Sequence, residues 1–451
     1  MWRKFVFLFL GVMVTGFAPV WAQTQGCEVP KGMTKDQKLP CVRTASILLD
    51  QPTLTPEQLS NGPDFDSANP DQSRFAYFTG NDTISCYFRP HYAFVAVPGD
   101  SMKFQCWHMT PDGAFYSKKG EPIRVDEVKV VIEKDKSGER SASLYARNDD
   151  KNEHEIKADR FKIKYLKPPY PDHNPRFNEV FTTLAASRIM WVLGFPADHV
   201  YPAAAASCIG CGNDPFGNKL TDNKASLKDA PTVFKIVSAE RELPWDEINP
   251  EDDETWSWTD AAKFYSDGEW SHKQKVEFDA YRLALGLIHY HNALPQQNRV
   301  DCAEWAQTEE GKPKVCSKPV IYVHDLGSTF GKKRSGFDLF GTNPRGSFDA
   351  WRPQTVFVNP GNCELRATLL GDKQVLKEAQ DLMIQRVARL DRDTVKSIFR
   401  VSRFNMMDQK QVRRLRSSGT QNVDEAALDE WTVVFMKRID EIRTASNCKA
   451  N

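Results

Sequence analysis

The sequence has no excess of charge of either sign and no apolar run of membrane-spanning length beyond its N-terminus. Its 451 residues include 60 basic and 60 acidic side chains. A balanced chain offers no electrostatic footprint for a polyanion, so we expect no nucleic-acid partner. A bilayer span needs about 20 apolar residues in sequence. Internal repeats and low-complexity blocks are also lacking, which argues against repeat architectures.

The first 22 residues have the three parts of an export signal. Basic MWRK precedes the apolar stretch FVFLFLGVMVTGF, and VWA supplies small residues just before Gln23. This order is typical of a cleaved signal peptide. The apolar stretch is short for a membrane anchor, and no cysteine follows the cleavage position directly to carry a lipid. We therefore expect an exported protein, periplasmic or secreted, with no stable membrane span after cleavage.

All ten cysteines lie after this signal, as expected of disulfides in an oxidising compartment. Sequence proximity predicts the pairs Cys27–Cys41, Cys86–Cys106 and Cys302–Cys316. It leaves four cysteines unassigned: Cys208, Cys211, Cys363 and Cys448. The CIGC motif at 208–211 is compatible with a redox or zinc site. It lacks a second CxxC or a histidine pair at metal spacing, which favours structural cystines.

Hydrophobic patterning divides the chain into the signal at 1–22, a loop-rich arm at 23–75, a β-rich region at 76–242 and a mostly helical region at 243–451. Alternation in ISCYF, MKFQCW and SASLYAR predicts strands in the β-rich region. From residue 372 onward, apolar residues recur at helical spacing.

One predicted strand and the helix after it carry charged residues of interest. RFKIKYL (160–166) has apolar residues on one face and Lys162 and Lys164 on the other. The helix is expected to be capped by Asn174 and ended by Gly194, with Glu179 and Arg188 on its polar side.

An acidic, tryptophan-bearing stretch lies at 243–260. LPWDEINPEDDETWSWTD contains seven carboxylates among three tryptophans. Such a stretch either binds a sugar or a cation, or forms an acidic surface loop whose tryptophans pack on the domain. Runs of charged residues usually form only a solvent-exposed surface with no binding role, which favours the second interpretation.

Five motifs occur in a fixed order over residues 100–410: MKFQC, FKIKY, AASRIMWVLGFPADHVYP, HYHNALPQQNR and DLGSTFG. Their order resembles the protein kinase-like fold. More closely, it is similar to a family of exported bacterial proteins of unassigned function. Chains of that family carry KFxC, KVKY, ASRxxWxLGF, HxDxKPxxQR and DLGxTFG motifs. Several ordered motifs are more specific than any one of them.

The resemblance implies an α+β, bilobal, disulfide-braced fold with a β-rich N-lobe and a helical C-lobe. It implies that Lys164, or as second choice Lys162, holds the phosphates of ATP and pairs with Glu179. Asp325 would hold Mg²⁺ or Mn²⁺, because hard cations prefer carboxylate oxygen. The alternative is an exposed lysine on an edge strand and a glutamate that stabilises a helix N-terminus.

The loop HYHNALPQQNR departs from the family pattern. Aligned on His289, His291 occupies the position of the catalytic base Asp, and Ala293 that of a Lys. A histidine accepts protons near neutral pH but lacks the anionic charge of an aspartate beside a metal. An extra residue leaves the amide ligand of a second metal open among Gln296, Gln297 and Asn298. Both histidines are equally compatible with structural roles, one buried and one at the surface.

Two further departures accompany the missing base. No glycine-rich nucleotide loop precedes the lysine strand, and an exported protein has no ready supply of ATP. Together they predict a degenerate, pseudokinase-like protein of the cell envelope that binds a nucleotide or an envelope protein partner. One alternative is an active phosphoryl or nucleotidyl transferase that uses Lys164, Glu179 and Asp325. Another is a module that binds glycan or another polymer.

Overall fold

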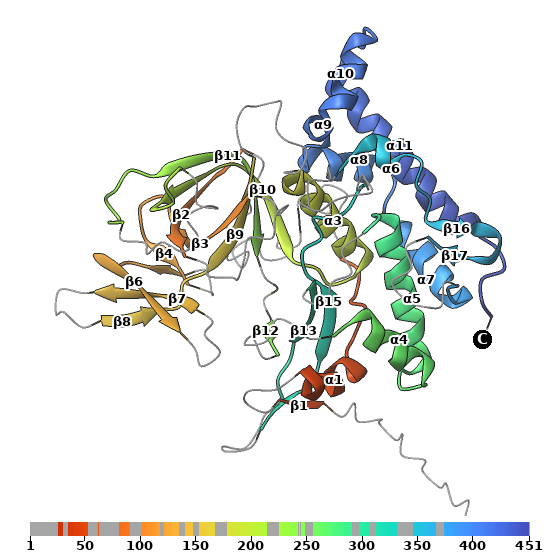
Figure 1. The fold of residues 1–451 in the computed structure, drawn as a ribbon, viewed down its shortest axis with the longest axis horizontal. Helices are drawn as coiled ribbons and strands as arrows, with labels where there is room; N and C mark the ends of the chain where they lie inside the picture. The colour runs from red at the N-terminus through yellow and green to blue at the C-terminus, as the bar shows by residue number, and fades with distance from the viewer. Residues whose placement is uncertain are drawn as a thin grey trace, which may run out of the picture.

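The chain has an α+β architecture in which strands β2–β11 (residues 83–241) gather on one side and most helices on the other, with α3 (Glu179–Leu193) between them (Figure 1). The computed structural model describes residues 26–29, 35–52, 62, 81–90, 102–117, 121–134, 140–147, 153–166, 178–213, 225–241, 243, 245–248, 256–290, 297–306, 313–331, 346–366 and 374–450.

Five strands form a closed barrel on the β-rich side. They are β2 (Thr83–Arg89), β3 (Lys103–Met109), β9 (Arg160–Tyr165), β10 (His199–Ile209) and β11 (Thr232–Arg241). Their order is β2-β10-β11-β9-β3, and β2 also pairs with β3, which closes the ring. β4 (Phe115–Tyr116) and β5 (Pro122–Ile123) extend the sheet from β3. A closed ring leaves β9 paired on both sides.

A separate three-stranded sheet lies beside the barrel. It contains β6 (Glu127–Lys134), β7 (Arg140–Arg147) and β8 (Glu153–Ile156), paired in the order β6-β7-β8. Leu144 and Ile156 from this sheet share a small hydrophobic cluster with Trp107 and Phe115 of the barrel side. Burial of this shared apolar surface attaches the small sheet to the barrel.

Helix α3 is buried on almost every side. Asn178 occupies its N-cap position, and Gly194 ends it with a φ of 82°, as the sequence predicts for that glycine. The expected cap, Asn174, lies outside the described residues. The expectation that α3 has a polar side is wrong. Arg188 is fully buried and donates a hydrogen bond to the Val200 carbonyl oxygen at 2.6 Å. Strands of the barrel and helices of the other side both contact α3.

The helical side is built from eight helices among the described residues. They are α4 (Trp258–Ser266), α5 (His272–Leu287), α6 (Phe348–Trp351), α7 (Lys377–Val387), α8 (Arg392–Val401), α9 (Phe404–Met407), α10 (Gln409–Ser417) and α11 (Val423–Thr444). Within the described ranges, none combines the length and apolar character needed to cross a bilayer.

Short sheets connect distant parts of the sequence. β12 (Asp246–Glu247), β13 (Asn298–Cys302) and β15 (Pro319–Val323) form one, and β16 (Phe357–Asn359) and β17 (Glu364–Leu365) flank the 3-10 helix η4 (Pro360–Asn362). β1 (Cys27–Val29) pairs with β14 (Lys314–Cys316), and α1 (Lys35–Thr44) follows it. The arm expected to be loop-rich thus contains a strand and a helix that pack on the folded chain.

Four disulfides join cysteines of the described residues. Cys27–Cys41 and Cys302–Cys316 confirm two sequence-based predictions, and the unassigned cysteines pair as Cys208–Cys211 and Cys363–Cys448.

The predicted Cys86–Cys106 disulfide is wrong, and both residues are buried free thiols. In the β2–β3 ladder Cys86 lies opposite His108 and Cys106 opposite Phe88. The two cysteines are therefore diagonal neighbours, and their thiols interact without being bonded to each other. Sequence proximity could not reveal this register.

Candidate functional site

The two lysines of β9 and a glutamate of β11 lie on one face of the barrel sheet. In the antiparallel β9–β11 ladder, Lys162 lies opposite Glu240 and Lys164 opposite Ser238. Residues two apart in a strand share a face, and opposite charges directly across a ladder attract. Lys162 forms an ion pair with Oε1 of Glu240. Lys162 and Lys164 thus lie on the same face of β9, as the alternation in the sequence predicts.

Lys164 is the centre of the site. Its ammonium is fully buried and lies 2.8 Å from Asp325 Oδ1, 3.1 Å from Glu240 Oε2 and 3.6 Å from Glu179 Oε2. It also donates a hydrogen bond to Thr183 Oγ1 at 3.1 Å. An ammonium has three donors, and three oxygens lie within 3.1 Å to receive them. The alternative of an exposed lysine on an edge strand is wrong, because β9 is paired on both sides.

Glu179 reaches Lys164 from the first turn of α3, and its side chain is buried. Gly327 of the DLG motif lies directly against it. A Cβ atom on Gly327 would fall 2.8 Å from Cδ of Glu179, closer than real Cβ contacts allow. Thr182, on the same helix, donates a hydrogen bond to the Gly327 carbonyl oxygen at 2.7 Å. The glycine is therefore needed for close approach of the DLG backbone to α3.

Asp325 lies just beyond the end of β15, where the chain turns. Its φ is 57°, a left-handed conformation that is uncommon outside glycine and clusters at functional sites. Its backbone N–H donates to Asp198 Oδ2 at 3.3 Å, and its Oδ1 accepts from the Gly327 N–H at 3.4 Å. The Asp325 side chain is 17% exposed. Within the Lys164–Glu179–Asp325 group it is the side chain that solvent reaches.

The charged groups keep one another ionised. Burial lowers the pKa of Lys164, but Asp325 and Glu240 outweigh burial and raise that pKa above its ordinary value. Burial raises the pKa of Asp325, yet Lys164, followed by Lys162 and Lys103, brings it well below its usual range. Burial also opposes ionisation of Glu240, while Lys162 and Lys164 lower its pKa to about 2. At neutral pH Lys164 is therefore an ammonium ion, and Asp325 and Glu240 are carboxylate ions.

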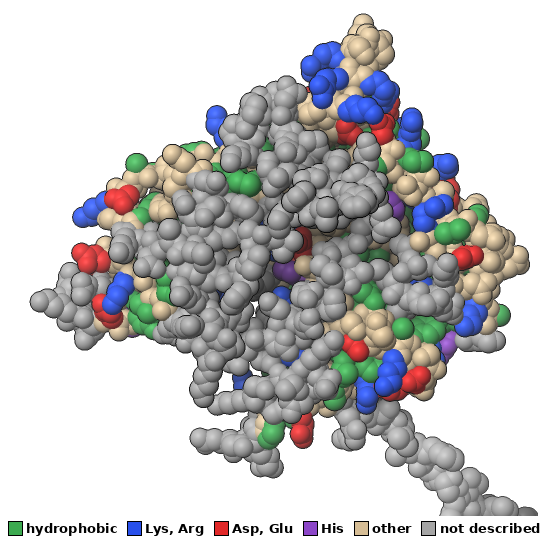
Figure 2. All heavy atoms as spheres, viewed as in Figure 1, with side chains coloured by type: hydrophobic (Ala, Val, Ile, Leu, Met, Phe, Trp, Pro, Cys, Tyr) green, Lys and Arg blue, Asp and Glu red, His purple; other side chains and the backbone are tan. Residues whose placement is uncertain are grey.

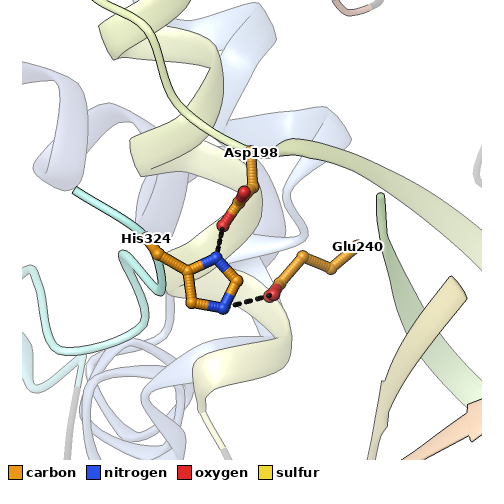
Figure 3. Close-up of side chains that lie close together, drawn as sticks. All are labelled: Asp198, Glu240 and His324. Carbon is orange, nitrogen blue, oxygen red and sulfur yellow. Dashed lines mark ion pairs between the residues drawn. The ribbon is translucent and has the colours of Figure 1, made fainter. Parts of the chain in front are cut away.

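His324 forms a second group of contacts beside this one (Figure 3). Its Nδ1 lies 2.5 Å from Asp198 Oδ2, and its Nε2 lies 3.8 Å from Glu240 Oε1 and 3.2 Å from Lys162 Nζ. The imidazole stands between the two carboxylates. On the face drawn in Figure 2, acidic, basic and histidine side chains come together near the centre, where the β-rich side meets the helices.

The histidines predicted for the catalytic loop are only partly described. His289 is buried directly after α5, has a φ of 55° and donates its backbone N–H to the Gly286 carbonyl oxygen. The neighbouring Ile288 carbonyl accepts from the Phe330 N–H at 2.9 Å, which holds the end of α5 against the segment after DLG. His291 lies outside the described residues, so its role stays a prediction.

The two described amide candidates differ in their surroundings. The backbone carbonyl of Gln297 accepts from the His324 N–H at 2.6 Å, so this residue lies beside the DLG segment. Its side-chain Oε1 is buried and has no hydrogen-bond partner within the described ranges. Asn298 Nδ2 instead donates to the Trp256 carbonyl oxygen at 2.9 Å, which anchors it in the packing. Gln296 lies outside the described residues.

Sequence reasoning missed Asp198, Glu240, His324 and Thr183 as members of the site. Glu240 had a usable signal, since Val237 and Ala239 are buried and strand alternation turns Glu240 to the other face. His324 stands directly before Asp325 in the HDLG motif. Asp198 lies within the motif AASRIMWVLGFPADHVYP, but no charge pattern marked it as a ligand. Thr183 gave no signal, because only the packing of α3 brings it here.

Two of the three tryptophans of the acidic stretch lie in the hydrophobic core and offer no exposed binding surface. Trp256 and Trp258 are buried and pack against Phe278, and Trp256 Nε1 donates to the Arg299 carbonyl oxygen at 3.0 Å. Sugar-binding tryptophans must present a ring face to solvent, so this geometry disfavours the glycan-binding alternative. The interpretation as packed tryptophans is confirmed for these two residues.

The described residues thus define an α+β protein with several disulfides and a buried lysine surrounded by carboxylates. No protein-family model matches the chain, and no curated protein matches it. Among solved structures, the proinflammatory kinase CtkA of Helicobacter pylori overlaps 67% of this chain and 90% of its own length. The identity is 11% and the TM-score 0.32. A likeness at this score carries no argument about the site.

Proposed function

We propose that the chain is an exported, kinase-like protein that binds a nucleotide together with a divalent metal ion and does not transfer the phosphate. The meeting of Lys164, Glu179 and Asp325 carries this proposal. The three come from β9, α3 and the end of β15, and Lys164 lies 3.6 Å from Glu179 and 2.8 Å from Asp325. A lysine paired with a helix glutamate, beside a metal-binding aspartate, is the charge arrangement used in phosphoryl transfer.

The donors around Asp325 fit a hard divalent cation. Asp325 is ionised and partly exposed. The backbone carbonyl of Gln297 accepts from the His324 N–H, and its buried side-chain Oε1 has no hydrogen-bond partner among the described residues. This Oε1 is the second oxygen proposed for the ion. Carboxylate and amide oxygens suit Mg²⁺ or Mn²⁺. When bound, the metal would neutralise phosphate charge. Asp325 would hold it, and Lys164 would stay on Glu179.

The surroundings of Lys164 favour binding without transfer. Its ammonium is fully buried and has Asp325, Glu240 and Thr183 within 3.1 Å. A phosphate can contact this ammonium only by displacing one of these oxygens. The resemblance also puts His291 where an aspartate base is expected. Both features support a degenerate site, and the four disulfides support export into an oxidising compartment.

A thermal-shift titration of the oxidised full chain tests this proposal. ATP with Mg²⁺ or Mn²⁺ is expected to raise the Tm, because a ligand that binds only the folded state stabilises it by mass action. Asp325→Asn should lose the shift. Asp349→Asn is the matched control, since Asp349 also pairs with a lysine, Lys410, but on α6 away from the site. No shift with any nucleotide, or an equal shift in Asp325→Asn, would reject the nucleotide site.

A further inference from the structure

The contacts of His324 select the tautomer in which Nε2 carries no proton and acts as a hydrogen-bond acceptor. Lys162 Nζ lies 3.2 Å from Nε2, and an ammonium has donors only. Nε2 therefore accepts, and the proton resides on Nδ1, where Asp198 Oδ2 receives it at 2.5 Å. A carboxylate that fixes the far ring nitrogen is the usual support of a metal-binding histidine, because it orients the ring and raises its basicity.

A second acceptor faces the same point. Glu240 Oε1 lies 3.8 Å from His324 Nε2, and Figure 3 shows these two atoms directed at each other. Two acceptors face each other stably only across a cation or a donor. That position is taken by Lys162, which contacts both Nε2 and Glu240 Oε1. Zinc binds histidine nitrogen and carboxylate oxygen at about 2.0–2.2 Å, so one ion can bridge a pair separated by 3.8 Å.

The acceptors are fixed, whereas the lysine can leave. The side chains of Glu240 and Asp198 are 2% and 4% exposed, but that of Lys162 is 18% exposed. A lysine side chain is a flexible chain of four carbons that can carry its charge into solvent. In addition, Asp198 Oδ1 is buried and has no hydrogen-bond partner within the described part of the chain.

We propose that His324 Nε2 and Glu240 Oε1 bind a divalent transition-metal ion of the zinc class, with Asp198 supporting the histidine and Lys162 occupying the ion's position in its absence. One ligand atom from each of Asp198, Glu240 and His324 lies within 4.8 Å of the others. A site with an imidazole ligand suits zinc, copper, iron or nickel better than magnesium or calcium. With two protein ligands, two positions of a tetrahedral ion stay open to water, one more than in catalytic zinc sites, which have three protein ligands.

Equilibrium dialysis of the oxidised full chain against Zn²⁺ alone, followed by metal analysis, tests the proposal. We expect one Zn²⁺ per chain, loss of binding in His324→Gln, and a decrease of about 10–100-fold in affinity in Asp198→Asn. Lys162→Gln should bind Zn²⁺ severalfold more tightly, because the competing ammonium is gone. Misfolding cannot mimic a gain in affinity. His272→Gln, which removes a half-exposed histidine 3.9 Å from Glu378, should bind as the parent does.

The proposal is overturned if the parent retains no Zn²⁺, if Lys162→Gln binds no more tightly, or if retention survives His324→Gln. The last result would place the metal on other donors, such as the thiols of Cys86 and Cys106. Asp325→Asn separates this site from the proposed nucleotide site. It should abolish the ATP-dependent rise in Tm and leave Zn²⁺ binding in place.

Discussion

Lys164 Nζ lies 2.8 Å from Asp325 Oδ1, although 161 residues separate the two in sequence. The contact joins an interior strand of the barrel to the turn after β15, and it is fully buried on the lysine side. Glu240 and Glu179 add two further carboxylates around the same ammonium. This cluster connects the β-rich side, helix α3 and the DLG segment. Its removal should therefore lower the free energy of unfolding and also weaken binding.

Replacing Lys164 by Met should be strongly destabilising. Removal of one member of a buried ion pair leaves an uncompensated charge and typically costs about 3–5 kcal/mol. The comparison is Lys129→Met, which removes an exposed lysine 3.2 Å from Glu153 and should cost less than about 1 kcal/mol. Urea denaturation of both variants measures the difference. Equal, small losses would show that the buried cluster contributes no special stability.

Gly327→Ala and Gly286→Ala should change stability in opposite directions. The added methyl at 327 would meet Glu179 Cδ at 2.8 Å, and overpacking of this kind costs about 1–3 kcal/mol. At 286, inside α5, the nearest atom is Val356 Cγ1 at an ordinary 3.5 Å, and alanine favours a helix by up to about 1 kcal/mol. Thermal unfolding of the pair checks this. A neutral Gly327→Ala would contradict the close approach to Glu179.

Stability should depend on pH through Glu240. Its pKa falls from an ordinary 4.5 to about 2 in the folded state. A depressed carboxyl pKa means that its stabilisation is complete above pH 4.5 and is lost as the pH falls toward 2. The free energy of unfolding of the parent should therefore approach that of Glu240→Gln as the pH is lowered through this window. A gap between the two proteins that stays constant from pH 5 to pH 3 would contradict the assignment.

The oxidised protein should contain two free thiols. Alkylation in denaturant, followed by peptide mass mapping, should label Cys86 and Cys106 and leave the other eight cysteines in four disulfides. In the native state, burial should protect both thiols from the reagent. A disulfide between Cys86 and Cys106 would contradict the two free thiols described here.

Local patterns predicted several parts of the site correctly. Alternation in β9 put both lysines on one face, and Gly194, which directly follows Val192 and Leu193, ended α3 as expected. The motif order singled out Glu179 and Asp325 before any contact was known. The common face of the lysines and the end of α3 depend on neighbours in sequence, so local chemistry reveals them. Glu179 and Asp325 were instead implied by the family resemblance.

Long-range packing explains what sequence did not reveal. Asp198 belongs to the segment before β10, and it meets His324 only because β15 ends beside that segment. Arg188 was expected on a polar side of α3, yet both sides of the helix are covered. The Cys86–Cys106 prediction failed because proximity in sequence says nothing about ladder register. Tertiary arrangement decides each of these cases.

The central claim is that the Lys164–Glu179–Asp325 cluster holds a nucleotide and its metal without turnover. Equilibrium dialysis of the oxidised full chain against ATP and Mg²⁺ or Mn²⁺, with ATP and ADP quantified on both sides, tests it most directly. We predict saturable, metal-dependent binding of one ATP per chain, absent in Asp325→Asn, with no ADP beyond the protein-free control. Absence of binding would contradict the nucleotide site, and ADP that forms only with intact Asp325 would contradict a non-transferring role.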